Sequence, residues 1–454
     1  MHIISGNKPI NENNEQEMPK LRRKTISLMT LGCKVNQYET EAMSELFANK
    51  GYEILPSEAR ADYYVINTCS VTNLGEKKSR QYIRKMKRQN PNAIIAVVGC
   101  YSQVATDEVM NIEGVNLVLG TNERSRIVEY MEELEPWDKV SYVGDIMQVR
   151  EFEELQIDHV TDKTRAFIKI QEGCNQFCSY CIIPYARGPI RSRQPEQVIK
   201  EVKRLVENGF KEIVLTGIHI ASYGKDFGNI ELIDLLKQVH EIDGLERIRL
   251  GSLEPRLLSE DFIKTIQTME KFCPHFHLSL QSGSDTVLKR MNRKYDAQTY
   301  LETVEAIKLA FDAPSFTTDV IVGFPGETDA EFEETMAFVS KVGFAKIHVF
   351  QYSPKKGTPA ADMGCQVNGD VKHTRSERLI ALSDQMEQAY YESLIGKSFT
   401  VLIEGLSTSN DEYMEGLSER YVRVFVPKDE TLIGTLQKVN FQSVKGDIVY
   451  GVRV

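Results

Sequence analysis

Three apolar runs near the start of the chain each end in a cysteine, and each is followed by a helical pattern. The runs are Thr25 to Cys33, Ala61 to Cys69 and Ala93 to Cys100. The helices are predicted at residues 39–50, 73–89 and near 103–112, where apolar residues repeat with the helical period. A strand followed by a helix, repeated in this way, is typical of a parallel α/β sheet.

The cysteines that end these runs are expected to converge. The carboxyl ends of parallel strands share one edge of the sheet, where ligands collect. Cys33, Cys69 and Cys100 are therefore predicted to meet, although they are well separated in sequence. Three thiols at one point indicate a metal cluster. The alternative is that they are small buried hydrophobic residues, as free cysteines often are.

A second cysteine group, Cys174-Asn-Gln-Phe-Cys178-Ser-Tyr-Cys181, directly follows another strand-like run. Its spacing lets three thiolates bind three irons of a cubane and leaves the fourth iron open, whereas a further cysteine completes the electron-transfer pattern. No other cysteine or histidine is close in sequence. The alternatives are a coincidence of spacing and a zinc site, which normally has four protein ligands.

The middle of the chain alternates between strands and helices. Strands are predicted at 166–171, 211–216, 246–251, 275–281, 315–322 and 345–350. Helices are predicted at 195–208, 230–241, 258–270, 296–311 and 328–341. About six strand-helix units form a parallel sheet that falls short of the eight in a closed barrel, so we expect a partial (β/α)6 barrel. From Ser398 the pattern changes to short alternating runs, which predict a small all-β module.

The chain is longer than one hydrophobic core usually organises. We expect a flexible tail at 1–24, an α/β domain at 25–140, an acidic linker at 141–160, the partial barrel at 161–393 and the β module at 394–454. The polar start lacks the apolar centre of a signal peptide. No apolar run approaches the roughly twenty residues that span a bilayer. A cytoplasmic location without membrane contact is expected, where cysteines bind metals rather than form disulfides.

The formal net charge of −10 argues against a general nucleic-acid binder, so any RNA contact must be local. Lys77, Arg80, Arg84 and Arg88 fall on one face of the helix at 73–89 and suit either RNA phosphates or solvent. A second basic group just past the cysteine loop is predicted to meet RNA phosphate, with a cofactor carboxylate or the acidic linker as alternative partners. It consists of Arg187, Arg191 and Arg193. The role of Trp137, the only tryptophan, is not indicated.

The Cys174, Cys178 and Cys181 spacing resembles the radical S-adenosylmethionine superfamily. The resemblance implies that the open iron of a 4Fe-4S cluster binds the amino and carboxylate groups of S-adenosyl-L-methionine, which one electron cleaves to a 5'-deoxyadenosyl radical. Thr216 and Gly217, at a strand end, are expected to let the methionine amino group approach, although a glycine there is often only a turn. Glu254 and Gln281 lie in segments that resemble those around the adenosyl group.

The segments Leu31-Gly-Cys33-Lys34-Val35-Asn-Gln37-Tyr-Glu39 and Asn67-Thr-Cys69-Ser-Val-Thr72 resemble the N-terminal domain of the methylthiotransferases. The resemblance implies that Cys33, Cys69 and Cys100 bind an auxiliary 4Fe-4S cluster, whose open iron carries the sulfur. Lys34-Val35 looks most like the branch acting on N6-threonylcarbamoyladenosine in tRNA, since the isopentenyladenosine branch usually has Gln-Met there. The C-terminal module resembles the RNA-binding TRAM domain.

The resemblance implies methylthiolation at C2 of the N6-threonylcarbamoyladenosine 3'-adjacent to the anticodon. The tRNA anticodon loop is then the partner, with a reductant such as flavodoxin or ferredoxin. No catalytic side chain beyond the two clusters is expected, because this aromatic C–H bond offers no route to acid-base chemistry. The alternatives are another tRNA adenosine such as isopentenyladenosine, a ribosomal protein, or a non-catalytic metal-stabilised RNA-binding protein. The sulfur donor, the residues that read the threonylcarbamoyl group and the oligomeric state are not indicated.

Overall fold

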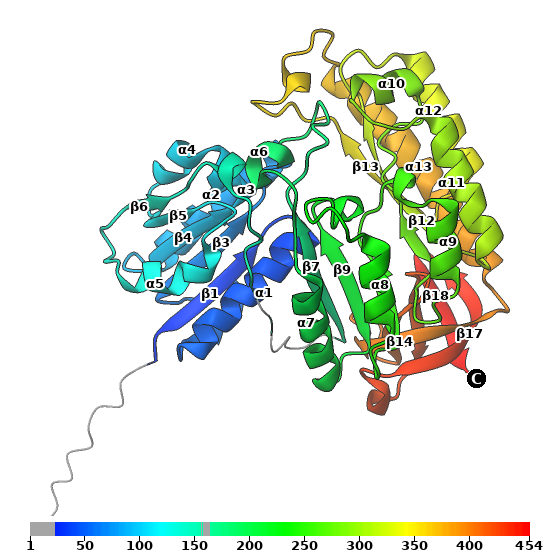
Figure 1. The fold of residues 1–454 in the computed structure, drawn as a ribbon, viewed down its shortest axis with the longest axis horizontal. Helices are drawn as coiled ribbons and strands as arrows, with labels where there is room; N and C mark the ends of the chain where they lie inside the picture. Colours follow the sequence, from blue (N-terminus) through cyan, green and yellow to red (C-terminus); the bar gives the residue numbers. More distant parts are fainter. Residues whose placement is uncertain (1–22, 156, 158–163) are drawn as a thin grey trace, which may run out of the picture.

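The computed structural model describes residues 23–155, 157 and 164–454. Figure 1 shows three parts in chain order: an α/β unit in blue and cyan, a larger α/β unit from green to orange, and a red C-terminal barrel. Nearly all of the expected tail, 1–24, lies outside the described residues. The predicted fold class, a parallel N-terminal sheet, a partial barrel and a terminal β-barrel, is confirmed.

The N-terminal unit is a six-stranded parallel sheet of order β2-β1-β3-β4-β5-β6. Its strands are β1 Thr25–Thr30, β2 Glu53–Leu55, β3 Tyr63–Thr68, β4 Ile94–Gly99, β5 Leu117–Leu119 and β6 Val140–Tyr142. Its helices are α1 Lys34–Asn49, α2 Asn73–Gln89, α3 Cys100–Val104, α4 Thr106–Met110 and α5 Ile127–Glu132. The central strands β3 and β4 are buried along their whole length, as in a sheet covered on both faces.

Two helices differ from the sequence prediction. Helix α1 begins at Lys34, five residues before the predicted start, because the Asn36 side chain donates to the Leu31 and Thr68 carbonyls and fixes the first turn against two strand ends. The helix predicted near 103–112 is instead two short helices, α3 and α4, which meet at Ala105 with φ −140°.

The central unit is a curved array of six parallel strands in chain order. They are β7 Arg165–Glu172, β9 Glu212–Gly217, β10 Arg247–Leu250, β11 His275–His277, β12 Ser315–Val322 and β13 Lys346–Gln351. Isolated parallel bridges join the β10 and β11 regions and make the array continuous. The short strand β8, Arg191–Ser192, pairs antiparallel with β7 at one edge.

The longer helices of the central unit cover the outside of this array (Figure 1). They are α7 Pro195–Glu207, α8 Leu232–His240, α9 Glu260–Gln267, α11 Ala297–Ala310, α12 Asp329–Val342 and α13 Gly369–Ser393. The short helix α10 is Asp285–Arg290, and the short helix α6, Ile183–Arg187, lies beside α3 of the N-terminal unit. The strand predicted at 275–281 stops at His277, since Gln281 has φ +71° and makes a single bridge. One continuous apolar core joins the strands to these helices.

The C-terminal module is a closed five-stranded barrel of order β14-β15-β16-β18-β17. Its strands are β14 Ser398–Leu406, β15 Tyr413–Ser418, β16 Arg423–Pro427, β17 Leu436–Lys445 and β18 Ile448–Arg453. Closure leaves no unpaired sheet edge, and apolar side chains fill the interior. The shape is consistent with the predicted TRAM-like module.

The described part of the segment expected to be an acidic linker, 141–160, packs on its neighbours. Its first residues complete β6, and Ile146, Leu155 and Ile157 are buried. Leu155 and Ile157 pack against Tyr38 of α1. Trp137, which precedes β6, is 77% exposed. None of the described helices combines the length and apolar character that crossing a membrane requires.

Candidate functional site

Cys33, Cys69 and Cys100 meet at the carboxyl edge of the N-terminal sheet. Cys33 precedes α1, Cys69 follows β3 and Cys100 begins α3. Burial raises the pKa of Cys100 to about 12, and the nearby Cys69 and Cys33 sulfurs add to that shift. The structure therefore brings together the three residues that the sequence predicted to converge.

Gly32 allows this close approach. It has φ +112°, which L side chains rarely adopt, and a Cβ atom there would lie 2.9 Å from Cys69 Cβ and 3.2 Å from Cys69 Sγ. The backbone before Cys33 thus passes directly against Cys69, and a side chain at this position would push the two segments apart.

Cys174, Cys178 and Cys181 form a second group in the loop between β7 and α6. Burial raises the pKa of Cys174 to about 11 and that of Cys181 to about 12, and the neighbouring Cys178 sulfur adds to both shifts. The guanidinium of Arg293 donates to Cys178 Sγ at 3.3 Å. Arg293 thus places a positive charge beside this cysteine group.

Each cysteine group offers three thiols, which is the ligand set of a cubane with one iron left free. Zinc–sulfur bonds of about 2.3 Å place ligand sulfurs about 3.8 Å apart. Among the described residues, one group of three possible ligands has all its donor atoms within 4.8 Å, and it is His277, Asp319 and His348 rather than either cysteine set. Wider sulfur triads suit clusters with one iron left free for another ligand.

Arg187 connects the two cysteine groups. It ends α6, which starts two residues after Cys181, and its Nε donates to Cys100 Sγ at 3.2 Å. Since α6 is only about 8 Å long, the two groups are near neighbours across the interface of the N-terminal and central units. Its Nη2 also donates to Asn36 Oδ1 at 2.6 Å.

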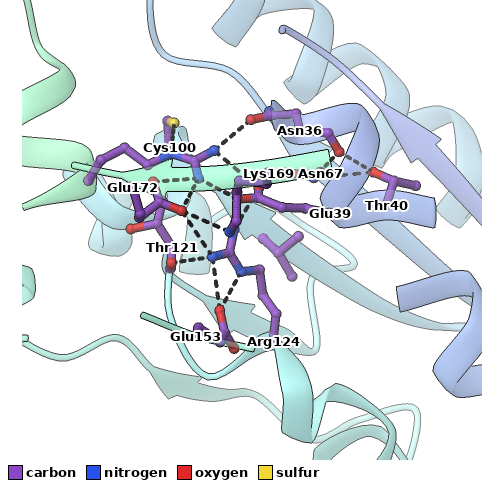
Figure 2. Close-up of polar contacts among 12 residues, drawn as sticks. Asn36, Glu39, Thr40, Asn67, Cys100, Thr121, Arg124, Glu153, Lys169 and Glu172 are labelled. Carbon is purple, nitrogen blue, oxygen red and sulfur yellow. Dashed lines mark hydrogen bonds and ion pairs between the residues drawn. The ribbon is translucent and has the colours of Figure 1, made fainter. Parts of the chain in front are cut away.

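A buried network of ion pairs surrounds Arg187 at this interface. Figure 2 shows the contacts of Glu39 and Glu172 with Lys169 and Arg124. Arg187 Nη1 bonds Glu39 at 2.5 Å and Glu172 at 3.1 Å. Lys169 contacts the same two carboxylates at 3.1 and 2.9 Å. Arg124 contacts Glu39 at 2.6 Å, and Glu153 at 2.9 Å provides the third carboxylate. Three cations therefore face three carboxylates, which is how buried charges are normally balanced.

The RNA role predicted for Arg187, Arg191 and Arg193 is wrong, because their side chains are buried inside the protein. Arg193 pairs with Glu201 and with Glu154 Oε2 at 2.8 Å. Glu154 belongs to the acidic segment. For Arg193, therefore, the acidic linker, which was the alternative to RNA, is the observed partner. Arg191 donates to the Pro189 carbonyl at 3.3 Å.

Not all cations of the basic face predicted on α2 are exposed and available for RNA. Lys77, Arg84 and Arg88 are exposed, and no carboxylate among the described residues pairs with them. Arg80 instead donates to Tyr101 Oη at 2.9 Å and pairs with Glu108 at 3.0 Å. Contact of this face with RNA stays a prediction for the three exposed cations.

A cavity of about 830 Å³ lies where the three units meet. The N-terminal unit contributes residues Gly32 to Val35 and Val71 to the cavity wall. Ile183, which lies two residues after Cys181, also lines the cavity. The predicted cofactor residues Thr216 and Gly217 line it, whereas Glu254 and Gln281 do not. Glu254 is engaged by His219 Nε2 at 2.9 Å and by Arg256.

The C-terminal barrel also lines this cavity, through Tyr421, Val422 and Asp447. Tyr421 has φ +64° in the turn between β15 and β16, and its ring stacks on buried His275 at 4.5 Å between centroids. The sequence alone does not single out Tyr421, because one tyrosine in a turn belongs to no recognisable motif. The same holds for the lining residues His277 and His348, since histidines scattered along the chain lack the spacing of a metal or catalytic site.

Family models match two parts of the chain. The radical SAM superfamily matches residues 168–339, and the family described as uncharacterized protein family UPF0004 matches residues 25–120. The threonylcarbamoyladenosine tRNA methylthiotransferase of Bacillus subtilis (strain 168) is 45% identical over 419 residues, 91% of this chain and 93% of that protein. The chain belongs to the radical SAM methylthiotransferase family.

Other members of the methylthiotransferase family carry two different names. A protein of Aquifex aeolicus named threonylcarbamoyladenosine tRNA methylthiotransferase is 40% identical, covering 88% of this chain and 100% of its own. A tRNA-2-methylthio-N(6)-dimethylallyladenosine synthase of Desulfitobacterium hafniense is 37% identical, covering 95% and 98%.

A solved radical S-adenosylmethionine methyltransferase from Kitasatospora setae has a similar fold. Its TM-score is 0.53 at 15% identity, covering 75% of this chain and 77% of that chain. Membership of the radical SAM superfamily implies a 4Fe-4S cluster and S-adenosyl-L-methionine for this methylthiotransferase.

Proposed function

We propose that this enzyme attaches a methylthio group to C2 of N6-threonylcarbamoyladenosine 3'-adjacent to the anticodon of tRNA. The relatives of highest identity reported above carry this substrate in their names. The observation that carries the proposal is the contact of Arg187 with Cys100, which joins two cysteine groups beside one cavity.

In this proposal Cys174, Cys178 and Cys181 hold the cluster that serves S-adenosyl-L-methionine, beside Thr216 and Gly217. Cys33, Cys69 and Cys100 hold a second 4Fe-4S cluster. When bound, these groups supply a carbon radical and a sulfur atom, which an aromatic C–H bond without an acidic proton requires. The cofactor role of Glu254 and Gln281 rests on the sequence alone.

The chain's own residues position these groups and receive the RNA. Gly32 lets Cys33 approach Cys69 within one cysteine group, and Arg187 links that group to the loop of the other. The cavity walls surround the target base. A base in a single-stranded anticodon loop is extruded at modest cost. We assign RNA contact to the exposed cations of α2 and to the C-terminal barrel at residues 394–454. A cytoplasmic location, shared with tRNA, and a flavodoxin or ferredoxin as reductant complete the proposal.

Nucleoside mass spectrometry of tRNA from a deletion strain tests this function. We expect 2-methylthio-N6-threonylcarbamoyladenosine to disappear and its unmethylthiolated precursor to accumulate. The wild-type gene should restore the product, whereas Cys33→Ala and Cys174→Ala should not. An unchanged product level would contradict the proposal, and loss of the dimethylallyl product instead would favour the second group of relatives.

Metal analysis tests the cofactor assignment separately. The protein purified without oxygen should contain about eight irons and eight sulfides per chain, as two cubanes require. Replacing either cysteine group by alanine should leave about four irons. Zinc without sulfide would instead support a non-catalytic RNA-binding protein.

A further inference from the structure

Lys34 has an unusual place in the cavity wall. It is the first residue of α1 and directly follows Cys33. Its ammonium lies 5.4 Å from the centre of the Tyr421 ring and 5.7 Å from that of Phe167. No carboxylate among residues 23–155, 157 and 164–454 pairs with it. Aromatic faces stabilise a cation only in part.

The other lysine in the cavity wall provides a comparison. Lys346 pairs with Glu387 at 2.5 Å and with Asp384 at 3.4 Å. Arg165 and Arg249, whose guanidinium groups lie beside the same Tyr421 ring, have their own carboxylates at 2.8 Å in Glu404 and Glu212. The cavity therefore contains one lysine whose charge is not neutralised by the described part of the chain.

His277, Thr317 and His348, which also line the cavity, suit uncharged parts of a ligand. His277 Nδ1 lies 2.9 Å from the Thr317 hydroxyl, and its Nε2 lies 3.4 Å from Asp319. Burial lowers the pKa of His348, and the charges of Lys346 and Lys34 add to that effect against the opposing charge of Asp319. Imidazole and hydroxyl groups bind amide and alcohol groups.

We propose that Lys34 binds the carboxylate of the threonylcarbamoyl group and thereby selects the nucleoside that the enzyme accepts. This inference rests on the proposed function. A threonine joined to adenosine through its amino group retains a carboxylate and a hydroxyl, whereas a dimethylallyl group is a hydrocarbon. A bound carboxylate neutralises the ammonium, and the hydrocarbon leaves it unpaired.

The chemistry of adenine agrees with this placement. C2 and the N6 substituent flank N1 on the same edge of the ring. A base that presents C2 toward the group at Cys33 therefore brings its N6 substituent to the adjoining part of the wall, where Lys34 lies. Cys33 and Lys34 are adjacent in the chain. In the same way, the reacting atom C2 and the recognised N6 substituent lie close together on the base.

The test uses the full chain with its iron restored and two anticodon stem-loop RNAs. One RNA carries N6-threonylcarbamoyladenosine and the other its methyl ester, which lacks the negative charge. Single-turnover product formation and dissociation constants are measured for the wild type, Lys34→Gln, Lys34→Arg and the exposed control Lys264→Gln. The wild type and the control should prefer the acid about 30-fold or more, the loss that follows when one partner of a buried charge pair is removed.

Lys34→Gln should lose this preference, and Lys34→Arg should keep most of it. Iron content should stay unchanged in both variants. The inference is overturned if Lys34→Gln weakens binding of acid and ester equally, or if it lowers iron content, since Lys34 would then act on Cys33. Failure of the proposed function is a different result, in which the wild type methylthiolates neither RNA although it cleaves S-adenosyl-L-methionine.

Discussion

Arg187 meets groups from three other segments of the chain, in α1, α3 and β7. A guanidinium suits this position because its planar donors reach several acceptors at fixed angles. Each partner is itself buried, so each depends on Arg187 for part of its hydrogen bonding. The residue is therefore a structural link between the two cysteine groups rather than a surface cation.

Replacing Arg187 by Gln should destabilise the protein strongly. The change leaves the buried carboxylates of Glu39 and Glu172 short of positive charge, which typically costs about 3–5 kcal/mol. Urea unfolding followed by circular dichroism measures the loss. Arg378→Gln is the control, because its partner Glu333 is exposed and little change is expected there. Equal stability of the two variants would show that the buried network contributes nothing.

Glu172 gives the network a dependence on pH. Burial alone would raise the pKa of its carboxyl, but Arg187 and Lys169 outweigh burial and lower it to about 2. A lowered pKa in the folded state contributes stability above the unfolded value of about 4.3, and that contribution is lost as the pH falls toward 2. The thermal midpoints of wild type and Glu172→Gln should therefore differ most above about pH 5 and converge on acidification. A constant difference would exclude this carboxylate as the source.

At the level of elements, strand β10 holds the C-terminal barrel against the central unit. Arg249 donates to the Glu419 and Ser418 carbonyls at 3.0 and 3.1 Å, and its Nε bonds Glu212 at 2.8 Å. Arg247 reaches the Leu417 carbonyl at 3.0 Å. The turn that carries Tyr421 is thus fixed through its backbone.

Arg249→Gln should loosen this attachment without unfolding the barrel, whose own core is separate. Amide hydrogen exchange should speed up around residues 417–423, while the barrel strands stay protected, because local opening follows the loss of local contacts. Arg423→Gln is the matched control, since Arg423 pairs with Glu415 inside the barrel. Unchanged exchange in Arg249→Gln would show that other contacts hold the turn.

The elements of the fold were largely predictable from the sequence. The bounds of α2 match the prediction because Thr72 caps the helix by accepting from the Gly75 amide, and Asn90 ends it. The start of α1 was missed because its first turn depends on side-chain bonds to strands distant in sequence. The role of Arg187 was missed for a similar reason: a local pattern does not distinguish a cation that faces RNA from one that faces carboxylates of another unit.

For RNA binding by the whole molecule, the local distribution of charge matters more than the negative net charge. The exposed cations Lys77, Arg84 and Arg88 share one face of α2, a helix that starts close behind Cys69. This arrangement places positive charge on the helix that follows Cys69, on an otherwise acidic protein. We expect this face to bind RNA phosphates, while the negative net charge keeps general attraction to RNA weak.

Replacing Lys77, Arg84 and Arg88 together by Gln should weaken tRNA binding and make it less sensitive to salt. The slope of log affinity against log salt should fall in magnitude by about two, since each lost phosphate contact removes roughly 0.7. Fluorescence anisotropy at several salt concentrations measures this slope. The control replaces Lys200, Lys203 and Lys237, exposed on α7 and α8. An equal change in both triple variants would indicate a general charge effect.

Tyr421 and its neighbours have a consequence for how the C-terminal barrel is regarded. A small C-terminal module of this kind is usually regarded as an independent accessory domain. Here, however, it supplies part of the cavity wall. A truncated enzyme ending at residue 393 would open this cavity to solvent and to dissolved hydrogen-atom donors such as thiols, in a reaction that depends on a short-lived radical. Its main defect would be wasteful turnover, with deoxyadenosine released faster than modified nucleoside is made, over and above any loss in RNA capture.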